Sequence, residues 1–191
     1  MDTALSIAIG IGLSAACGFR IFIPLLAIAI AGHTGHIQLA PDFAWMHSET
    51  AITIFATAAI AEVIAYFIPV IDNLLDSMAS PLAIIAGTIL TASMVTDISP
   101  VLRWTLAIIA GGGIAGLIQG ASLVTRTTST VATAGIGNIF ISFFELLGAL
   151  FISIISLSLP FAALAIVIIL IILFLYSLIR KQRRKFTLLP N

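Results

Sequence analysis

Long apolar segments separated by short polar stretches fill most of the chain of 191 residues. A helix needs about 20 apolar residues to cross roughly 30 Å of hydrocarbon. Segments of suitable length and composition predict spans at residues 4–32, 50–69, 81–96, 101–123, 136–158 and 160–179. We therefore expect an all-α polytopic bundle of about six transmembrane spans, with residues 1–179 as a single transmembrane domain and residues 180–191 as a basic tail.

The first and third predicted spans have unusual lengths. Residues 4–32 are long for one crossing and contain Gly18 and Pro24, which favours a kinked, tilted or broken helix over a straight rod. Residues 81–96 are short for a span. Immediately before them, PVIDNLLDSMAS at residues 69–80 repeats apolar positions at helical spacing with polar residues on the other side. This pattern predicts an amphipathic helix that is interfacial or re-entrant.

The composition excludes an ordinary soluble domain. Hydrophobic residues make up 61% of the chain and charged residues only 8%, and the mean hydropathy is +1.24. Such values are typical of an integral membrane protein. The formal net charge is zero, so the charge distribution indicates membrane topology and we expect no nucleic-acid partner.

Positive charges are concentrated at the end of the chain, where Arg180, Lys181, Arg183, Arg184 and Lys185 lie. The positive-inside rule places this tail in the cytoplasm. An even number of spans then puts both termini and the loop with Arg126 in the cytoplasm, and residues 33–49 outside. The first residues lack the basic leader of a signal peptide, so we expect them to be retained.

Arg20, Glu62 and Glu145 lie near the middle of three predicted spans. A charge at the centre of a spanning helix costs about 2.5 to 3.5 kcal/mol, so each needs a partner. Because consecutive helices commonly pack together, we expect Arg20 to pair first with Glu62, with Glu145 as a second carboxylate. The uncompensated carboxylate then holds a proton or binds a cation. The alternative is an ion-pair network that only fixes helix packing.

Two polar groups are predicted at the cytoplasmic side. Asp72 and Asp76 are four residues apart, so they share one helix face and either recruit a cation at an entrance or form a solvated polar face. Arg126, Gly135 and Gly137 precede the fifth predicted span, with Asn138 at its start. Backbone amides there can bind an anionic headgroup, and the alternative is an ordinary capped loop.

Motifs for enzymes or cofactors are missing from the sequence. GGGIAG at residues 111–116 matches a nucleotide-binding glycine pattern, but no strand precedes it. His33, His36 and His47 lack a firm fourth ligand, so we expect no metal site. The single cysteine, Cys17, has no partner for a disulfide. We expect a protein that is not an enzyme and needs no cofactor.

Three segments resemble one known family: GFRIFIPLL at 18–26, EVIAYFIPVIDNLLD at 62–76 and TAGIGNIFISFFE at 133–145. This pattern is similar to the bacterial membrane family catalogued as domain of unknown function 4126. The resemblance implies a bacterial inner-membrane protein, and it implies no particular activity. The matching positions are Gly18, Arg20, Pro24, Glu62, Pro69, Asp72, Asp76, Gly135, Gly137, Asn138, Ser142 and Glu145.

The functional hypothesis is transport of a small solute, an ion or a lipid headgroup. Its predicted pathway residues are Arg20, Glu62, Asp72, Asp76, Asn138 and Glu145. In this mechanism Arg20 binds an anionic group while a glutamate changes protonation. The alternative is a scaffold that binds membrane lipids or belongs to a larger complex. Either role is compatible with a homo-oligomer.

Overall fold

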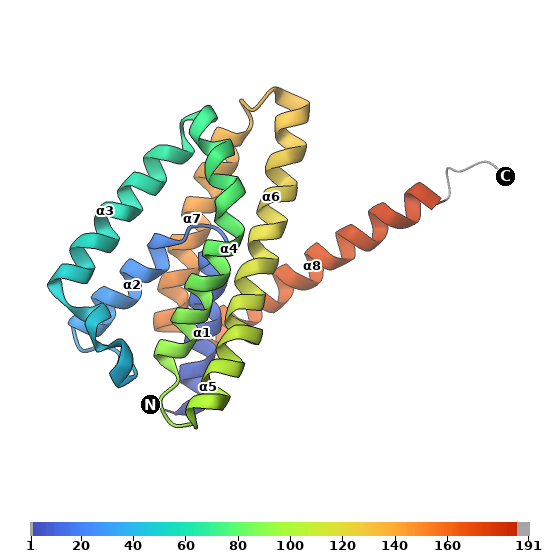
Figure 1. The fold of residues 1–191 in the computed structure, drawn as a ribbon. Coiled ribbons are helices and arrows are strands. Elements are labelled where there is room, and N and C mark those ends of the chain that lie inside the picture. The colour runs from blue at the N-terminus through green and yellow to red at the C-terminus, as the bar shows by residue number, and fades with distance from the viewer. Residues whose placement is uncertain (1, 187–191) are drawn as a thin grey trace.

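In the computed structural model, which describes residues 2–186, helices follow one another and the described residues contain no strand (Figure 1). The elements are α1 (Thr3–Cys17), α2 (Phe22–His33), the 3-10 helix η1 (Pro41–His47), α3 (Glu49–Tyr66), α4 (Pro69–Met94), α5 (Pro100–Leu106), the π-helical segment η2 (Ala107–Gly112), α6 (Gly113–Thr133), α7 (Asn138–Ser158) and α8 (Pro160–Phe186). The all-helical prediction is confirmed.

Residues 4–32 form two helices and not one span. With 15 and 12 residues, α1 and α2 extend about 22 and 18 Å, too short to cross the hydrocarbon. Gly10 of α1 packs against Thr91 near the end of α4. Beyond α2, the amide of Ala40 donates to Ser93 O at 2.8 Å, also at the end of α4. The start of α1 and the end of α2 therefore lie at the same end of the bundle, and the two helices form a re-entrant hairpin (Figure 1).

The break is explained by two residues that the sequence indicated. A Cβ atom on Gly18 would lie 2.5 Å from Ile118 Cβ and 2.8 Å from Ala115 O, so the turn packs closely against α6. Pro24 lies in the first turn of α2, where a missing amide hydrogen breaks no helical hydrogen bond. Within residues 2–186, five helices are long and apolar enough to span a membrane, and the hairpin replaces the first predicted span.

A second correction concerns residues 69–80, which are continuous with the predicted third span in the 26-residue helix α4. Its polar residues Asp72 and Asp76 contact Arg126, which draws this side of the helix into the bundle instead of to an interface. The position of Arg126 also differs from the predicted one. This residue belongs to α6, in the continuous helical segment Pro100–Thr133, and not to a cytoplasmic loop.

Two ends of the bundle can now be defined. The loop end contains residues 34–48 and 95–99 and the start of α1, and the charged end contains residues 66–76 and 126–138. Helix α8 begins near the loop end, where Ala163 faces Gly12, and it continues past α6 and α7 into the first residues of the predicted tail. Residues 187–191 of that tail lie outside the described part.

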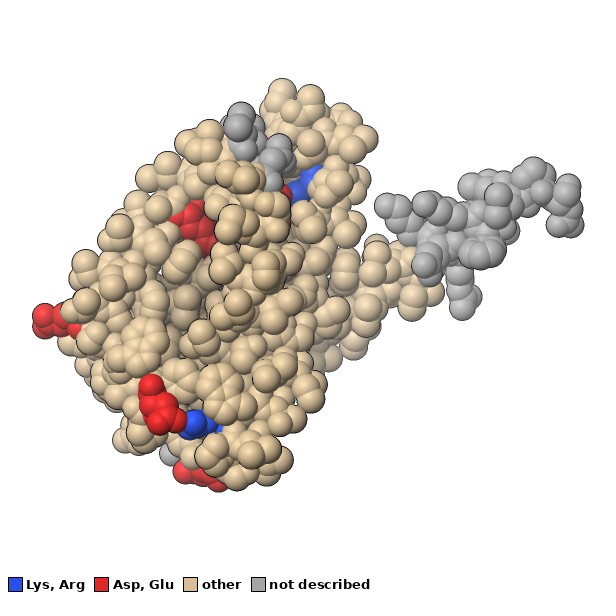
Figure 2. All heavy atoms as spheres, viewed as in Figure 1, with Lys and Arg blue, Asp and Glu red and all other residues tan. Residues whose placement is uncertain are grey.

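Helix α1 forms the interior of the bundle because it is apolar and small on all sides. Ten of its residues are buried, and Ser14 donates to Gly87 O at 2.6 Å on α4. The outer helices expose large apolar side chains, such as Val101 at 76% and Ile109 at 70%. Figure 2 accordingly shows a face that is almost free of charged atoms except for small patches. Such a surface is that of a membrane-embedded protein.

Candidate functional site

Arg126 of α6 is the centre of a buried group of charges at the charged end. Its side chain is only 2% exposed and forms ion pairs with Asp72 of α4 and Glu145 of α7. Nε donates to Glu145 Oε1 at 3.2 Å, and Nη2 donates to Ser142 Oγ at 2.9 Å. The guanidinium group therefore joins α4 to the two consecutive helices α6 and α7.

Arg20, in the turn of the re-entrant hairpin, contacts the same cluster. Its Nη2 atom lies 3.5 Å from Glu145 Oε2 and donates to Ser142 O at 3.0 Å. The prediction that Arg20 contacts a glutamate is confirmed for Glu145. Both guanidinium groups also lie over the Tyr66 ring, with Arg20 at 3.8 Å and Arg126 at 4.6 Å from its centroid. The aromatic ring stabilises the two cations by cation–π attraction.

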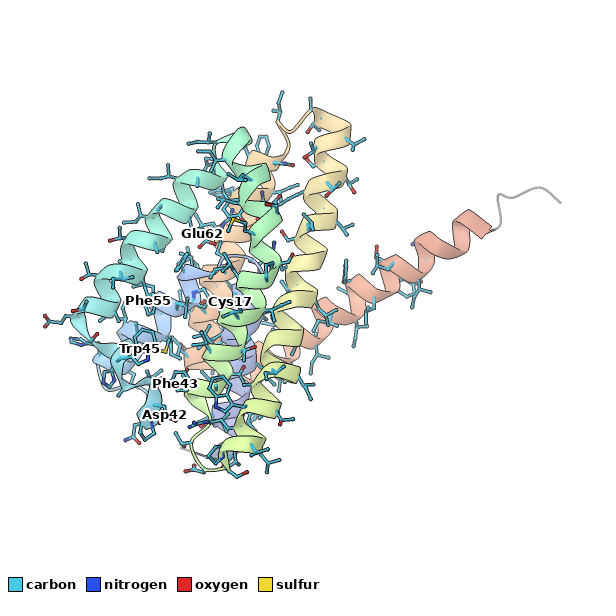
Figure 3. The ribbon with its side chains drawn as sticks, viewed as in Figure 1. Cys17, Asp42, Phe43, Trp45, Phe55 and Glu62 are labelled. Carbon is cyan, nitrogen blue, oxygen red and sulfur yellow. The ribbon has the colours of Figure 1, made fainter. Side chains whose placement is uncertain are left out.

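Glu62 of α3 has a different partner from the one first expected. Its carboxylate accepts hydrogen bonds from the backbone amides of Ile21 at 2.8 Å and Phe22 at 3.0 Å. These amides begin α2 inside the protein, where they lack helical acceptors. A carboxylate satisfies them and complements the positive end of the helix dipole. Figure 3 shows Glu62 on the inner side of α3, toward the end of α1 that carries Cys17.

Asp72 and Asp76 do not form a solvated face. They are 1% and 8% exposed, and Asp72 binds Arg126 and accepts from Asn138 Nδ2 at 3.2 Å. Asp76 Oδ1 lies 3.8 Å from Arg126 Nε and has no hydrogen-bond partner among the side chains that the structure describes. Asp76 also lines a cavity of about 380 Å³ together with Thr127. The structure thus brings this pair into the cluster and not to a surface entrance.

The predicted headgroup contact of Arg126, Gly135 and Gly137 is not assembled. Gly135 lies in the turn before α7 with φ +89°, and the Gly137 amide donates to Thr133 Oγ1 at 2.9 Å. Arg126 lies about two helical turns before this turn. Asn138 connects the two regions because its Nδ2 also donates to Thr130 Oγ1 at 2.9 Å.

The cluster contains four carboxylates and two guanidinium groups, a formal charge of −2. Its charged members are Arg20, Glu62, Asp72, Asp76, Arg126 and Glu145. The sequence did not single out Ser122, which donates to Glu145, or Tyr66. Each was detectable, because Ser122 is one turn before Arg126 and Tyr66 is one turn after Glu62, so each shares a helix face with a charge.

Among the residues that the structure describes, no three His, Cys, Asp or Glu side chains are arranged to hold a metal ion. The histidines have local contacts. His33 Nδ1 lies 3.0 Å from His47 O, and His36 Nδ1 lies 2.8 Å from Thr34 Oγ1. The chemistry of the site is therefore that of carboxylates, guanidinium groups and hydroxyls.

A family model described as a domain of unknown function, DUF4126, matches residues 7–180. The chain belongs to this family. All six charged residues of the cluster fall within the DUF4126 match. Among curated proteins and among solved structures, no match was found.

Proposed function

We propose that this DUF4126 protein transports a small solute, an ion or a lipid headgroup through the charged cluster. The observation that carries the proposal is the excess of carboxylates over guanidinium groups within the cluster, whose members are buried except for the half-buried Glu62. Ionisable groups inside a membrane are costly and generally mark ion or substrate pathways. The proposed pathway residues are Arg20, Glu62, Asp72, Asp76, Asn138 and Glu145.

Cavities around the cluster support this proposal. Glu145 lines a cavity of about 560 Å³ between α6, α7 and α8, and Glu62 lines one of about 340 Å³ between α2, α3 and α4. The third, of about 380 Å³, contains Asp76 between α4 and α6. The short helix α2 also begins at the cluster, as half-helices do at transporter binding sites. In the proposed cycle, Arg20 holds an anionic group while the carboxylates exchange protons.

The proposed location is the bacterial inner membrane, with the charged end toward the cytoplasm. Helix α8 continues toward that side, and its last turns contain the basic residues, which the positive-inside rule places in the cytoplasm. The prediction that both termini are cytoplasmic required residues 4–32 to cross the membrane once. With a re-entrant hairpin, the start of α1 lies at the loop end, so we now propose that it faces outward with residues 34–48.

One observation favours a scaffold as a second candidate. Arg126 forms ion pairs that tie α4, α6 and α7 together. A network of this kind also stabilises a static bundle, which then binds lipids, a second copy or a larger membrane complex. Transport requires water to reach the cluster, whereas a scaffold does not.

The experiment measures this access without knowledge of the solute. In a Cys17→Ser background, Ser122→Cys places a thiol beside Glu145. We expect a membrane-impermeant cationic methanethiosulfonate to modify it from both sides of oriented vesicles, at different rates. The control is Ile109→Cys, a position in η2 that faces outward and is 70% exposed, and it stays unmodified in hydrocarbon. If Ser122→Cys reacts from neither side, transport is rejected in favour of the scaffold.

The same assay tests the orientation. Cysteines at His36 and Asp2 are expected to react from outside, and a cysteine at Gln182 from the cytoplasm. Labelling of Asp2→Cys and His36→Cys from opposite sides would contradict the hairpin, because its two open ends lie together.

A further inference from the structure

The beginning of α2 is an anion site already occupied by a side chain of the protein. Glu62 accepts the amide hydrogens of Ile21 and Phe22, the first donors of a 12-residue helix. The start of a helix combines free amide groups with the positive end of the helix dipole, so it attracts carboxylates, phosphates and sulfonates. Here the attraction acts in a low-dielectric interior, where it is strong.

A second, independent feature indicates that the site has hydrogen-bond donors for an acceptor other than Glu62. Arg20, which immediately precedes Ile21, is 1% exposed, yet its Nε and Nη1 atoms have no hydrogen-bond partner among the described residues. Within this part of the chain, its side chain forms one hydrogen bond, from Nη2 to Ser142 O. Buried donors without acceptors are costly, so an incoming anion gains hydrogen bonds that the protein by itself leaves unmade.

The unused donors of Arg20 belong to the same region as the helix start. Its guanidinium lies 3.8 Å over the ring of Tyr66, which is one turn after Glu62 on the same face of α3. Arg20 therefore contacts one residue of the wall of the adjoining cavity, Tyr66, and it directly precedes the amides that Glu62 accepts. For an anion that displaces Glu62, the amides are the first donors and the neighbouring Arg20 supplies the charge.

The cavity beside Glu62 indicates which chemical group the rest of a bound anion would have. It measures about 340 Å³ and is lined by Ile21, Phe22, Glu62 and Tyr66 together with apolar residues of α3 and α4 such as Leu82. Apart from the carboxylate and the phenol, its wall offers only apolar side chains. A ligand that fills it needs one anionic group and an apolar body.

We propose that the start of α2, Arg20 and this cavity bind an amphiphilic anion that displaces Glu62, which takes up one proton from water. The ligand class is an alkyl carboxylate, phosphate or sulfonate, either soluble or as the headgroup of a lipid. Proton uptake keeps the total charge of the cluster unchanged when the anion enters. This proposal adds a substrate class to the proposed transport function. It rests on that function only for the movement of the bound anion across the membrane.

Other titratable groups surround Glu62 and bear on its protonation. They are Cys17 of α1, Arg20 of the hairpin turn, Tyr66 of α3, Glu145 of α7 and, beyond Tyr66, Asp76 of α4. Glu62 is the group that shares its hydrogen-bond donors with the incoming anion, so it is the one expected to titrate on binding. A variant at this position separates its contribution from that of its neighbours.

The test measures binding to the purified full chain in a neutral detergent. The probe is octanesulfonate, which stays ionised in the weakly acidic to neutral range. For uptake of one proton, affinity rises by about tenfold for each unit by which the pH falls. Calorimetry in buffers of different ionisation heat measures the proton directly in the unmodified protein, so the test does not depend on a variant folding.

Glu62→Gln keeps one acceptor oxygen at the start of α2 and removes the charge. We expect this variant to bind octanesulfonate at neutral pH as tightly as the unmodified protein binds it in acid, with no dependence on pH. Glu49→Gln, the same change on the first turn of α3, is the matched control and should keep the original pH dependence. Equal binding of octylammonium, absence of proton uptake, or an unchanged pH dependence in Glu62→Gln overturns the proposal.

Two further arms identify the source of the anion. Phosphatidate in nanodiscs that competes with octanesulfonate supports a lipid headgroup, and competition only by soluble alkyl anions supports a free solute. Inorganic phosphate, which has no apolar body, should compete at least tenfold more weakly than octanesulfonate. Binding with proton uptake but without water access at Ser122→Cys keeps the anion site and rejects transport, so the two proposals fail separately.

Discussion

The two ends of the bundle each contain an ion pair between arginine and aspartate, and the pairs differ in their surroundings. At the charged end, the Arg126 and Asp72 side chains are both 2% exposed. At the loop end, Arg103 Nη2 lies 2.5 Å from Asp42 Oδ2, with side chains 10% and 68% exposed. Figure 3 shows Asp42 beside Phe43 at the loop end, far from Glu62.

This difference shows that an ion pair between arginine and aspartate contributes differently to stability in the two places. An exposed carboxylate keeps its water, so the pair at the loop end adds at most about 1 kcal/mol. There, the contact between Phe43 and Trp104, with ring centroids 6.1 Å apart, also attaches residues 34–48 to α5. At the charged end, each group depends on the other because both side chains are buried within the bundle. Removal of a charge at the charged end should therefore lower the unfolding free energy more than removal of a charge at the loop end.

The largest expected effect comes from breaking the buried pair. Arg126→Met leaves Asp72 and Glu145 without their main cation, and loss of one partner of a buried pair costs about 3 to 5 kcal/mol. We expect this loss of unfolding free energy in titrations with sodium dodecyl sulfate in mixed micelles.

The double variant Arg126→Met with Glu145→Gln is its control. It should be less destabilised than the sum of the two single variants, because fewer carboxylates remain unpaired. Strict additivity, or a loss below about 1 kcal/mol for Arg126→Met, would show that the buried pair contributes no more than an exposed one.

The next effect distinguishes two glycines, one near each end. Gly18→Ala forces a Cβ against Ile118 and Ala115, and overpacking of this kind costs about 1 to 3 kcal/mol. Gly35 has φ +76° and open space around it, so Gly35→Ala costs about 1 kcal/mol through backbone strain.

Asparagine separates the two causes, because it tolerates the left-handed conformation. Gly35→Asn should be close to the original stability, whereas Gly18→Asn should be worse than Gly18→Ala. The same micelle titrations measure both, and a mild Gly18→Asn would mean that the hairpin turn is not packed against α6.

A smaller change is expected from Glu62→Gln. Hydrogen bonds to a charged group contribute about 1.5 to 3 kcal/mol and neutral ones about 0.5 to 1.5, so the variant loses roughly 1 to 2 kcal/mol. Glu49→Gln, on the exposed first turn of the same helix, should change the thermal midpoint little. Equal shifts of the two midpoints would contradict the role of Glu62 at the start of α2.

The smallest effect is expected at the loop end. Arg103→Met should lower the unfolding free energy by about 0.2 to 1 kcal/mol, because Asp42 regains water when its partner is lost. The difference should shrink further in high salt, which screens exposed charges. A loss as large as that of Arg126→Met would remove the contrast between the two ends.

The sequence by itself determined that the protein is a helical membrane bundle and which residues need partners. Hydrocarbon thickness fixes how many apolar residues a span requires, and the cost of a buried charge marks Arg20, Glu62 and Glu145 without any coordinates. Gly18 and Pro24 also indicated where the first segment breaks, since both act on the local backbone.

Only the tertiary structure decided how those residues pair. Arg126 and Asp72 are 54 positions apart in the chain, and spacing along one helix says nothing about which face of another helix it meets. Hydropathy likewise cannot distinguish one kinked span from a hairpin, because both need the same apolar residues. The hairpin exists because Glu62 of α3 satisfies the first amides of α2 and α6 accommodates the turn at Gly18, contacts that arise only when the helices pack.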